Sequence, residues 1–458
     1  MKDAFRDRLW RLIDGALGRH YTDPTMSGKR AKRLLCLCGI LPLVVSTSVW
    51  AGRVNDVRAA TLLPVRLCTS LPLSSPGFGQ GARGIENSVA LATEEWRSRF
   101  RAAHLDLLPP LTMDDGTPAN RNFDPGQEKL NAKRCVRGND TLAYVSPMLS
   151  AAALVSEPIL NQAAMLQING ITTNAYLTNP LGRKSLEPAT FAHRLAYPTF
   201  YRVVTTDVLV GPSEVAYMQR KQHAQTYVLI TDPTGYGTGV GTTARAYADR
   251  IGLRLIGAAQ LNYGPPSTIA SSANAVADVV AAKQPGAVLC GCSFTDLIAA
   301  FVHALRRKGY AGPLFGPDSL APQPGYNYPF TESDANIYSG APGLYSRGAA
   351  SAFRSAYRRR FHVPLQYYDA LSYDAADIAL NAIYQASLAG TLRGTRFQRR
   401  QAILPYAAHV RWHGATGITT FDRNGDTRHL TVSLFKAHQG SWLFIGRAPE
   451  VAGVSPTD

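Results

Sequence analysis

The sequence predicts an α/β protein with parallel β-sheets, arranged in two lobes, and three observations support this prediction. Apolar segments of strand length alternate with amphipathic segments of helix length along most of the chain. Pro, Gly, Asn and Asp occupy the segments that connect them. Of the 458 residues, 45% are hydrophobic and 17% are charged, which is enough for one large core or two medium cores.

Residues 26–52 predict an export signal. A basic cluster at 29–33 precedes an apolar run that begins at Leu34, and small residues follow up to Ala51, where we expect cleavage. If it is not cut, the stretch 34–51 is just long enough to span a bilayer, so a signal anchor is the alternative. Residues 1–25 are then either a misassigned start or a cytoplasmic segment, because Met26 directly precedes the basic cluster.

In the first part of the mature chain, short apolar runs predict strands, and apolar residues three or four apart predict helices. In chain order, the sequence predicts a strand at 62–67, a helix at 82–100, a strand at 142–145, a helix at 150–162 and a strand at 165–168. The segment 105–137 is polar and irregular, which indicates a long loop around one strand.

The same alternation continues through the middle of the chain. Helices are predicted at 211–222, 244–251, 273–283 and 294–308, and strands at 226–230, 254–256 and 286–289. Near the C-terminus the pattern changes, because Asn424-Gly425 predicts a hairpin turn within residues 421–426. Short strands are expected after it at 430–435 and 442–445, which gives an antiparallel tail on a parallel α/β body.

The formal charge of +16 does not indicate a nucleic-acid partner. The first 52 residues hold 9 Lys or Arg and 4 Asp or Glu, and the other basic residues are spread along the chain. Basic runs at 306–308, 357–361 and 399–400 are typical of solvated helix faces, and no ladder of aromatic residues accompanies them.

Four cysteines remain after the export segment, and their pairing is open. They are Cys68, Cys135, Cys290 and Cys292, and an oxidising compartment would allow three pairings. Cys290 and Cys292 lie two apart on one strand and therefore point to the same face, which makes them poorly placed to bridge each other. Buried thiols and a single disulfide both fit the pattern.

Catalytic, cofactor and metal sites are not expected. The chain has no Gly-x-Ser-x-Gly turn, and the glycines at 235, 237, 239 and 241 do not have the spacing of a dinucleotide-binding loop. The histidines are scattered along the chain, and no CxxC pair is present.

Small polar residues stand at the ends of predicted strands, where helices begin. Ser150, Thr172, Thr173 and Asp296 occupy such positions. In an open α/β sheet these positions face the ligand crevice, where the N–H groups of a helix N-terminus hold a carboxylate and an acidic side chain pairs with an ammonium. The alternative for each residue alone is a helix N-cap.

These residues lie in motifs that resemble the branched-chain amino acid (leucine/isoleucine/valine)-binding protein family, the extracytoplasmic solute-binding receptors of ABC transporters. The densest block is residues 144–178, YVSPMLSAAALVSEPILNQAAMLQINGITTNAYLT. The others are 79–84 (GQGARG), 230–239 (ITDPTGYGTG), 368–376 (YDALSYDAA) and 421–426 (FDRNGD). Together these motifs are specific, and the resemblance spans nearly all of the mature chain.

The resemblance implies the type I periplasmic-binding fold, in which two Rossmann-like lobes with parallel sheets are joined by three crossovers and close on a ligand by a hinge motion. We expect lobe 1 at 60–205 and 345–412, lobe 2 at 206–344 and 413–450, and a tail at 451–458. Crossover-like stretches at 201–206 and 336–343 support these ranges.

The resemblance also implies which residues hold the ligand carboxylate. Carried over by position, they are Ser150 and Thr173, together with the backbone near Ile171. Where the family usually has Ala-Ala, this chain has Ile171-Thr172.

Three further positions are implied for the rest of the ligand. Asp296 stands where the family usually has a Glu that pairs with the α-ammonium, and it is one methylene shorter. Tyr236 corresponds to a tyrosine that closes over the ligand from the second lobe, and Phe78 lies near a position that touches the ligand side chain.

We therefore expect a non-enzymatic receptor, without a cofactor, that captures an amino acid or a similar small polar ligand and delivers it to an ABC permease in the membrane. The alternative is a membrane-anchored sensor or regulator with the same fold. Whether residues 34–51 remain in the mature protein distinguishes the two.

Overall fold

The computed structural model describes residues 62–75, 78–116, 123–178, 195–320, 336–343, 349–438 and 441–453. The predicted export segment at 26–52, its possible role as an anchor through 34–51 and the alternatives for residues 1–25 lie outside these ranges. Within them, no helix combines the length and the apolar character needed to cross a membrane.

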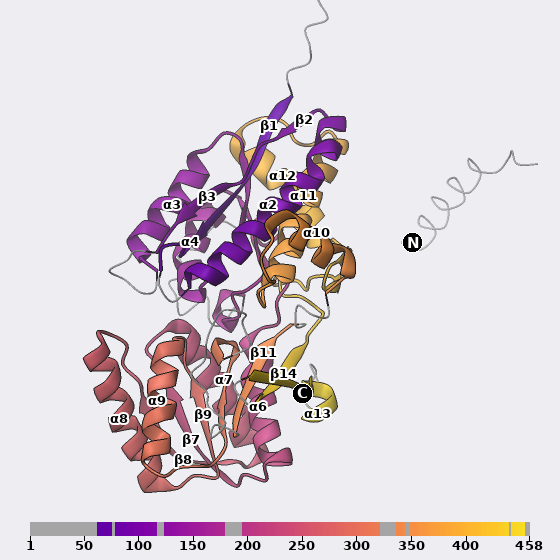
Figure 1. Ribbon diagram of the computed structural model, residues 1–458. Helices are drawn as coiled ribbons and strands as arrows, with labels where there is room; N and C mark the ends of the chain where they lie inside the picture. The colour runs from indigo at the N-terminus through magenta and orange to yellow at the C-terminus, as the bar shows by residue number, and fades with distance from the viewer. Residues whose placement is uncertain are drawn as a thin grey trace, which may run out of the picture. The chain divides into compact units, whose positions relative to one another are not determined.

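The first sheet is parallel, as the alternation of strands and helices predicts (Figure 1). Its strand order is β2-β1-β4-β5-β6, and β3 also pairs in parallel with β1. The strands are β1 (Leu63–Leu71), β2 (Leu105–Leu107), β3 (Leu111–Asp114), β4 (Thr141–Val145), β5 (Leu166–Asn169) and β6 (Phe200–Arg202). The strands expected at 62–67, 142–145 and 165–168 correspond to β1, β4 and β5.

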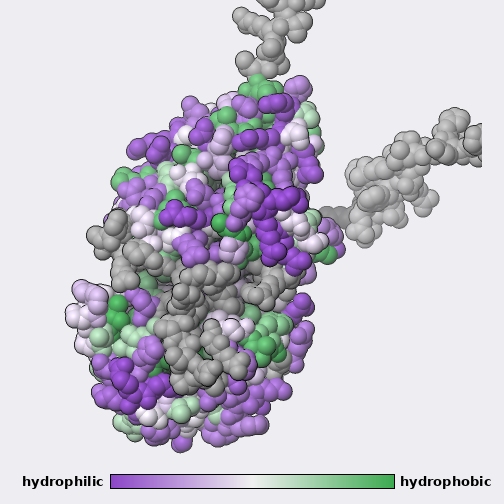
Figure 2. All heavy atoms as spheres, viewed as in Figure 1, coloured by the Kyte–Doolittle hydropathy of each residue, from purple (hydrophilic) through white to green (hydrophobic). Residues whose placement is uncertain are grey.

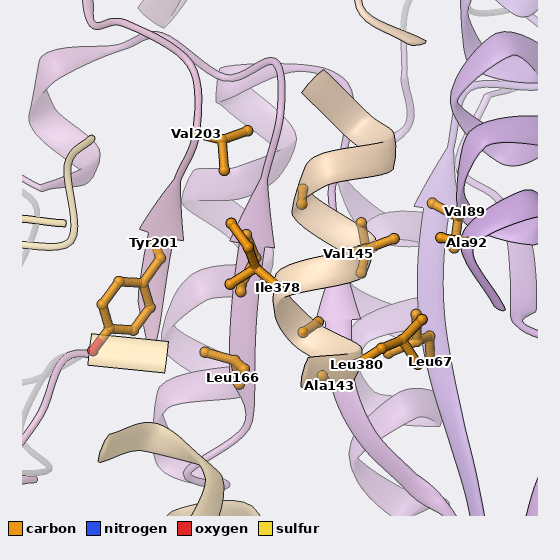
Figure 3. Close-up of a cluster of buried hydrophobic side chains, with 14 of the residues drawn as sticks. Leu67, Val89, Ala92, Ala143, Val145, Leu166, Tyr201, Val203, Ile378 and Leu380 are labelled. Atoms are coloured by element: carbon orange, nitrogen blue, oxygen red, sulfur yellow. The ribbon is translucent and has the colours of Figure 1, made fainter. Parts of the chain in front are cut away.

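Helices cover both faces of the first sheet. Successive residues of a strand point to opposite faces, so each strand contributes side chains to the core on either side. Leu67 faces the cluster that contains α2 (Gly79–Ala102), α11 (Asp369–Leu388) and α12 (Arg396–Ala408). Its neighbour Cys68 faces the cluster that contains α3 (Pro125–Arg137) and α4 (Ser150–Gln162). Figure 3 shows Ile378 and Leu380 of α11 among the side chains of the strands. The helix α10 (Ser351–Phe361) packs on α2.

The second sheet is parallel from β8 to β11 and ends in the predicted antiparallel tail. Its order is β15-β14-β11-β10-β9-β7-β8. The strands are β7 (Thr226–Thr231), β8 (Arg254–Gln260), β9 (Ala287–Gly291), β10 (Leu314–Gly316), β11 (Ile337–Pro342), β14 (Val432–His438) and β15 (Ser441–Arg447). The covering helices are α6 (Asp207–Lys221) and α7 (Gly235–Ile251) on one face, and α8 (Pro266–Lys283) and α9 (Thr295–Arg307) on the other.

The chain passes between the two sheets three times: after β6, after β11 and before β14. The stretch 336–343, expected to be a crossover, contains β11 itself.

The hairpin of β12 (Trp412–Gly414) and β13 (Gly417–Thr419) lies against α11, where Asp374 accepts the N–H groups of Ala415 (2.6 Å) and Thr416 (2.8 Å). This hairpin spans the boundary expected between residues 412 and 413. Short helical turns η1 (Ala175–Leu177), η2 (Asp318–Leu320) and α13 (Ala448–Val451) complete the fold.

Two expected elements differ from the structure. The loop expected at 105–137 is wrong, because it contains β2, β3 and α3, and α3 starts where Asp124 accepts the N–H of Gln127 (2.9 Å). The helix expected at 244–251 begins at Gly235, since Thr234 accepts the N–H of Gly237 (2.9 Å) and caps it. A Cβ at Gly237 would lie 2.5 Å from the Gly291 carbonyl oxygen, so this glycine serves close packing and not a turn.

The expectation that the basic pair at 399–400 lies on a solvated face is wrong for Arg400. Its side chain is buried and donates to the carbonyl oxygens of Thr141 (3.0 Å), Gly138 (3.0 Å) and Val136 (3.0 Å). Burial lowers the pKa of this guanidinium to about 10. Arg400 therefore satisfies the carbonyls at the end of α3 and the start of β4.

All four remaining cysteines are bonded. Cys68 pairs with Cys135, which joins β1 to α3. Cys290 pairs with Cys292, so the expectation that these two are poorly placed to bridge is wrong. Their Cα atoms are 5.3 Å apart, within the range that a disulfide spans, because the chain leaves the regular strand after Gly291.

Apolar side chains are concentrated in the cores. Among the described residues on the face drawn in Figure 2, hydrophilic side chains predominate and hydrophobic ones form small, separate patches.

Candidate functional site

A cavity lies at the carboxyl ends of strands from both sheets. Fifteen described residues line it. Nine follow strands of the first sheet or precede its helices, and we call them the first wall: Phe78, Phe123, Met148, Leu149, Ser150, Ala151, Ile171, Thr173 and Tyr368. Six follow strands of the second sheet, and we call them the second wall: Thr234, Tyr236, Ser293, Phe294, Asp318 and Ser319. This is the place where open α/β sheets bind ligands.

The first wall presents hydrogen-bond donors. Ser150 is the first residue of α4, so its N–H and that of Ala151 have no acceptor within the helix. The Ser150 hydroxyl accepts the N–H of Asn174 (3.4 Å) and does not cap the helix. The N-cap alternative therefore does not describe Ser150, whose hydroxyl lies at the cavity.

The loop after β5 is held by a buried asparagine. Asn169 Oδ1 accepts the N–H groups of Ile171 (2.7 Å) and Thr172 (2.8 Å), and its Nδ2 donates to the Pro147 carbonyl oxygen (2.8 Å). The backbone N–H of Ile171 is thus already engaged, and Ile171 lines the cavity with an apolar side chain.

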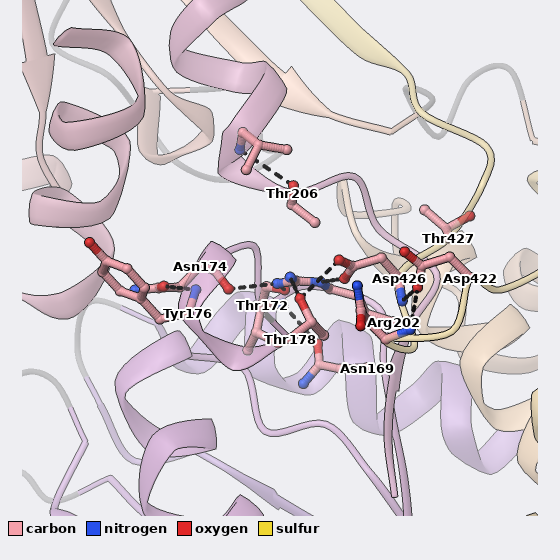
Figure 4. Close-up of polar contacts among 12 residues, drawn as sticks. Asn169, Thr172, Asn174, Tyr176, Thr178, Arg202, Thr206, Asp422, Asp426 and Thr427 are labelled. Atoms are coloured by element: carbon pink, nitrogen blue, oxygen red, sulfur yellow. Dashed lines mark hydrogen bonds and ion pairs between the residues drawn. The ribbon is translucent and has the colours of Figure 1, made fainter. Parts of the chain in front are cut away.

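A buried arginine supports the same loop from behind (Figure 4). Arg202 is fully buried and donates to the carbonyl oxygens of Thr172 (3.2 Å) and Asn174 (2.8 Å) and to the Thr178 hydroxyl (2.5 Å). Its Nε pairs with Asp426 at 2.6 Å, at the turn predicted within 421–426. This network joins the loop after β5 to the turn at 421–426.

The second wall is organised by Asp232, a buried carboxylate behind it. The Thr234 hydroxyl and the Ser293 N–H donate to the two oxygens of Asp232, each at 2.5 Å. The hydroxyl groups of Thr234 and Ser293 are 2.6 Å apart. Asp232 therefore joins the loops after β7 and β9 and sets both hydroxyls at the cavity.

Asp318 is the carboxylate of the second wall. One of its oxygens accepts the hydroxyl of Tyr236 and the other accepts the hydroxyl of Tyr368, which comes from the first wall. Burial raises the pKa of Asp318, and the two tyrosine donors oppose this shift. Burial raises the pKa of Tyr236 and Tyr368 well above the ordinary value of a tyrosine, and the charge of Asp318 raises it further.

Further buried acids stand behind Asp318. Burial raises the pKa of Asp207 to about 7, and the Thr173 hydroxyl opposes the shift. Burial also raises the pKa of Glu214, whose Oε1 accepts the N–H of Gly340 at 3.0 Å. The charge of Asp318 raises the pKa of both Asp207 and Glu214 further.

The structure brings five of the six predicted ligand-binding residues to one cavity: Phe78, Ser150, Ile171, Thr173 and Tyr236. Asp296 is not among the residues that line it. It lies in the first turn of α9, and its Oδ1 accepts the N–H of Leu297 at 3.0 Å. The sequence interpretation missed Asp318, Tyr368 and Arg202. Asp318 has the same sequence signal as the others, because it is a polar residue that follows a strand, β10.

Groups of metal ligands are not found in the described part of the chain: no three His, Cys, Asp or Glu side chains there could hold a metal ion. The first wall of the cavity offers hydrogen-bond donors, and the second wall offers a carboxylate. The ring centroids of Phe78, from the first wall, and Phe294, from the second wall, are 6.1 Å apart.

The sequence matches the periplasmic binding protein family over residues 117–438. The fold is similar to that of the leucine-binding protein LivK from Thermotoga maritima, with a TM-score of 0.68, 19% identity, and 86% of this chain and 99% of that chain covered. It is also similar to LivJ from Streptococcus pneumoniae in complex with isoleucine (TM-score 0.62, 16% identity, 84% and 98% covered). A solute-binding protein from R. palustris in complex with benzoate matches with a TM-score of 0.65 and 13% identity over 84% and 96% of the two chains. No curated protein sequence gives a significant match.

Proposed function

This chain belongs to the periplasmic binding protein family, and we propose that it is a non-enzymatic extracytoplasmic receptor that captures an amino acid or a similar small polar ligand and delivers it to an ABC permease. The observation that carries this proposal is the cavity lined by nine residues of the first wall and six of the second. A ligand in this cavity contacts loops of both sheets, which is the requirement for capture by closure of the two lobes.

We propose that the ligand carboxylate binds at the first wall. The N–H groups of Ser150 and Ala151 at the start of α4, with the Ser150 hydroxyl, are donors suited to an anion. Thr173 adds a second hydroxyl at the same wall. Isoleucine and benzoate, found in two of the similar structures, share a carboxylate, which supports this assignment.

Apolar and aromatic residues of both walls surround the remaining volume. Phe78 and Ile171 extend the first wall, and Phe294 stacks on Tyr263 with ring centroids 4.0 Å apart. We propose that these residues contact the side chain of the ligand, and that Tyr236 closes over it from the second wall.

The test is a thermal-shift screen of the full-length protein against the twenty amino acids, benzoate and 3,4-dihydroxybenzoate. Because a ligand stabilises the native state by RT ln(1 + [L]/Kd), a concentration of about a hundred times Kd adds about 2.7 kcal/mol and a clear rise in Tm. Uptake of the compound that binds should fall in cells that lack this protein. A panel in which no compound changes Tm contradicts the proposal.

Export is proposed on the family membership and on residues 26–52. Mass spectrometry of the extracytoplasmic and membrane fractions should find an N-terminus near Gly52, or an intact segment 34–51. A full-length protein found only in the cytoplasm would contradict export in both forms.

A further inference from the structure

We propose that a basic surface at the edge where the strands of the first sheet begin binds the anionic phospholipid headgroups of the membrane. We call this surface the basic edge. It consists of exposed or half-buried side chains at the end of α3 and at the start of α12: Lys133, Arg134, Arg137, Arg393, Arg396 and Arg399. The inference goes beyond the capture of a ligand in the cavity and does not depend on which ligand that is.

Two segments that are distant in the sequence form the basic edge. Arg396 donates to the carbonyl oxygens of Val136 (3.4 Å) and Arg137, and Arg399 donates to the carbonyl oxygen of Asn139 (3.2 Å). These contacts fix the start of α12 against the end of α3. The cations of both segments therefore lie on one surface of the protein.

The charge of the basic edge is not compensated within the described part of the chain. Segments 129–139 and 389–411 together hold nine Lys or Arg and no Asp or Glu. Asp140, which follows the first segment, pairs with Arg66 (3.2 Å), and no described acid forms an ion pair with the six side chains of the basic edge. An anionic surface would reduce the repulsion among these cations.

The other basic runs of the sequence differ from the basic edge in this respect. In the run at 306–308, Lys308 pairs with Asp278 at 2.5 Å. In the run at 357–361, Arg360 pairs with Glu94 of α2 at 2.9 Å. The basic edge is thus the stronger candidate for an anionic partner.

The chain enters the fold at the basic edge, which favours a membrane as that partner. β1 begins there, since the N–H of Arg66 donates to the carbonyl oxygen of Asp140 (2.8 Å) in the loop after α3. Eleven residues, 52–62, separate β1 from the predicted export segment, and a chain of that length spans at most about 40 Å. In the anchored form, in which residues 34–51 stay in the membrane, the basic edge is therefore held close to the bilayer.

Binding at the basic edge leaves the cavity accessible. The cavity lies where the strands of the first sheet end, and the basic edge lies where they begin. β1 is nine residues long, which corresponds to about 30 Å. A membrane contact at the basic edge therefore does not cover the cavity.

The experiment measures the binding of the full-length protein to vesicles by sedimentation. The vesicles consist of phosphatidylcholine with and without about 30% phosphatidylglycerol, which carries the negative charge. Residues 1–61 have basic and apolar residues of their own. The test therefore compares variants that leave this segment unchanged.

The edge variant combines Arg134→Gln, Arg137→Gln and Arg393→Gln. These three side chains form no hydrogen bond within the described residues, so their replacement removes charge and no internal contact. At about 0.1 M salt we expect this variant to bind the phosphatidylglycerol vesicles at least about tenfold more weakly than the wild type. At about 1 M salt, where the Debye length falls from about 10 Å to about 3 Å, this difference should be lost.

The matched control combines Arg97→Gln, Arg358→Gln and Arg359→Gln. It removes the same charge from exposed positions on α2 and α10, away from the ends of α3 and α12. We expect its affinity for the same vesicles to change by less than about threefold. Melting of both variants checks that they fold.

Two results would overturn the inference. One is binding of the wild type that does not increase with phosphatidylglycerol. The other is an edge variant that binds these vesicles as tightly as the control does, which would leave a protein with an acidic face as the occupant of the basic edge. Neither result affects the proposed capture of a ligand, because the thermal-shift screen contains no lipid.

Discussion

The two walls of the cavity are built from the same kind of element, the loop between a strand and a helix, yet they are supported in opposite ways. Behind the first wall lies a buried cation, Arg202, which is paired with Asp426 and saturated by carbonyl and hydroxyl oxygens. Behind the second wall lies the buried carboxylate of Asp232, which accepts the Thr234 hydroxyl and the Ser293 N–H. The difference gives the cavity a direction, with donors at one end and an acid at the other.

The polarity of the two walls is set by buried groups that do not line the cavity. In the loop after β5, Arg202 occupies the carbonyl oxygens of Thr172 and Asn174, and Asn169 Oδ1 occupies the N–H groups of Ile171 and Thr172. The donors left at the first wall are those at the start of α4. The second wall accepts because its carboxylate is met by tyrosine hydroxyls instead of a cation. Four substitutions test this contrast.

The largest effect is expected at the support of the first wall. Arg202→Met leaves Asp426 without its ion-pair partner and the Thr172 carbonyl oxygen without a donor, so the free energy of unfolding should fall by about 3–5 kcal/mol. Chemical denaturation measures it. The control is Arg245→Met at the exposed pair with Asp249, where a change below about 1 kcal/mol is expected. Equal effects would show that the network does not support the wall.

Asp207, a buried acid whose N–H donates to the Thr173 carbonyl oxygen of the first wall (2.9 Å), should make stability depend on pH. The ordinary pKa of Asp207 is 3.8 and its folded value is about 7, so its contribution to stability is fully present below pH 3.8 and is lost as the pH rises through 7. Asp207→Asn should therefore raise the free energy of unfolding at about pH 8 by about 1–3 kcal/mol and have little effect near pH 4. Denaturation across this range is the measurement. A pH-independent difference would contradict the assignment.

The donors of the first wall are tested by Ser150→Ala. Loss of one hydroxyl that binds a carboxylate should weaken the ligand by about tenfold, with little change in Tm because this side chain does not cap α4. Ser156→Ala on the same helix is the control, since the Ser156 hydroxyl donates to the Ala152 carbonyl and lies outside the cavity. An equal loss of affinity in both variants would place the effect on the helix and not on the hydroxyl.

The smallest effect is expected where the two walls meet. Tyr368→Phe keeps the ring but removes one donor from Asp318, which should weaken the binding of an amino acid by about three- to tenfold. Tyr367→Phe is the control, because that hydroxyl reaches the carbonyls of Pro342 and Gly343 instead. Titration of both variants decides whether the contact across the cavity matters for binding.

The fold was largely predictable from local patterns. Strands such as β4 and β7 are short apolar runs between turn residues, and each reaches a core on both faces, as parallel strands do. The prediction failed at α3, because only a few residues of this polar helix are buried and the apolar period is weak. It also failed at the start of α7, because the helix was expected from 244 and the glycines at 235–241 form its first turns.

The place of the candidate site in the fold was predictable from the sequence, but the acidic side chain that lines it was not. The rule that polar residues after parallel strands face a crevice identified Ser150 and Thr173, which line the cavity. The same rule selected Asp296 and passed over Asp318, since both follow strands of the second sheet. The direction of each carboxylate depends on the conformation of its loop.

The sequence by itself determined the alternation of elements, the α/β class and the edge of the sheets where a ligand binds, because these follow from hydrophobic period and from the geometry of parallel strands. Only the tertiary structure decided which acid reaches the cavity, that Arg202 is buried against Asp426, and that Cys290 pairs with Cys292. These outcomes depend on contacts between residues distant in the chain or on loop conformation. Local periodicity contains no information about either.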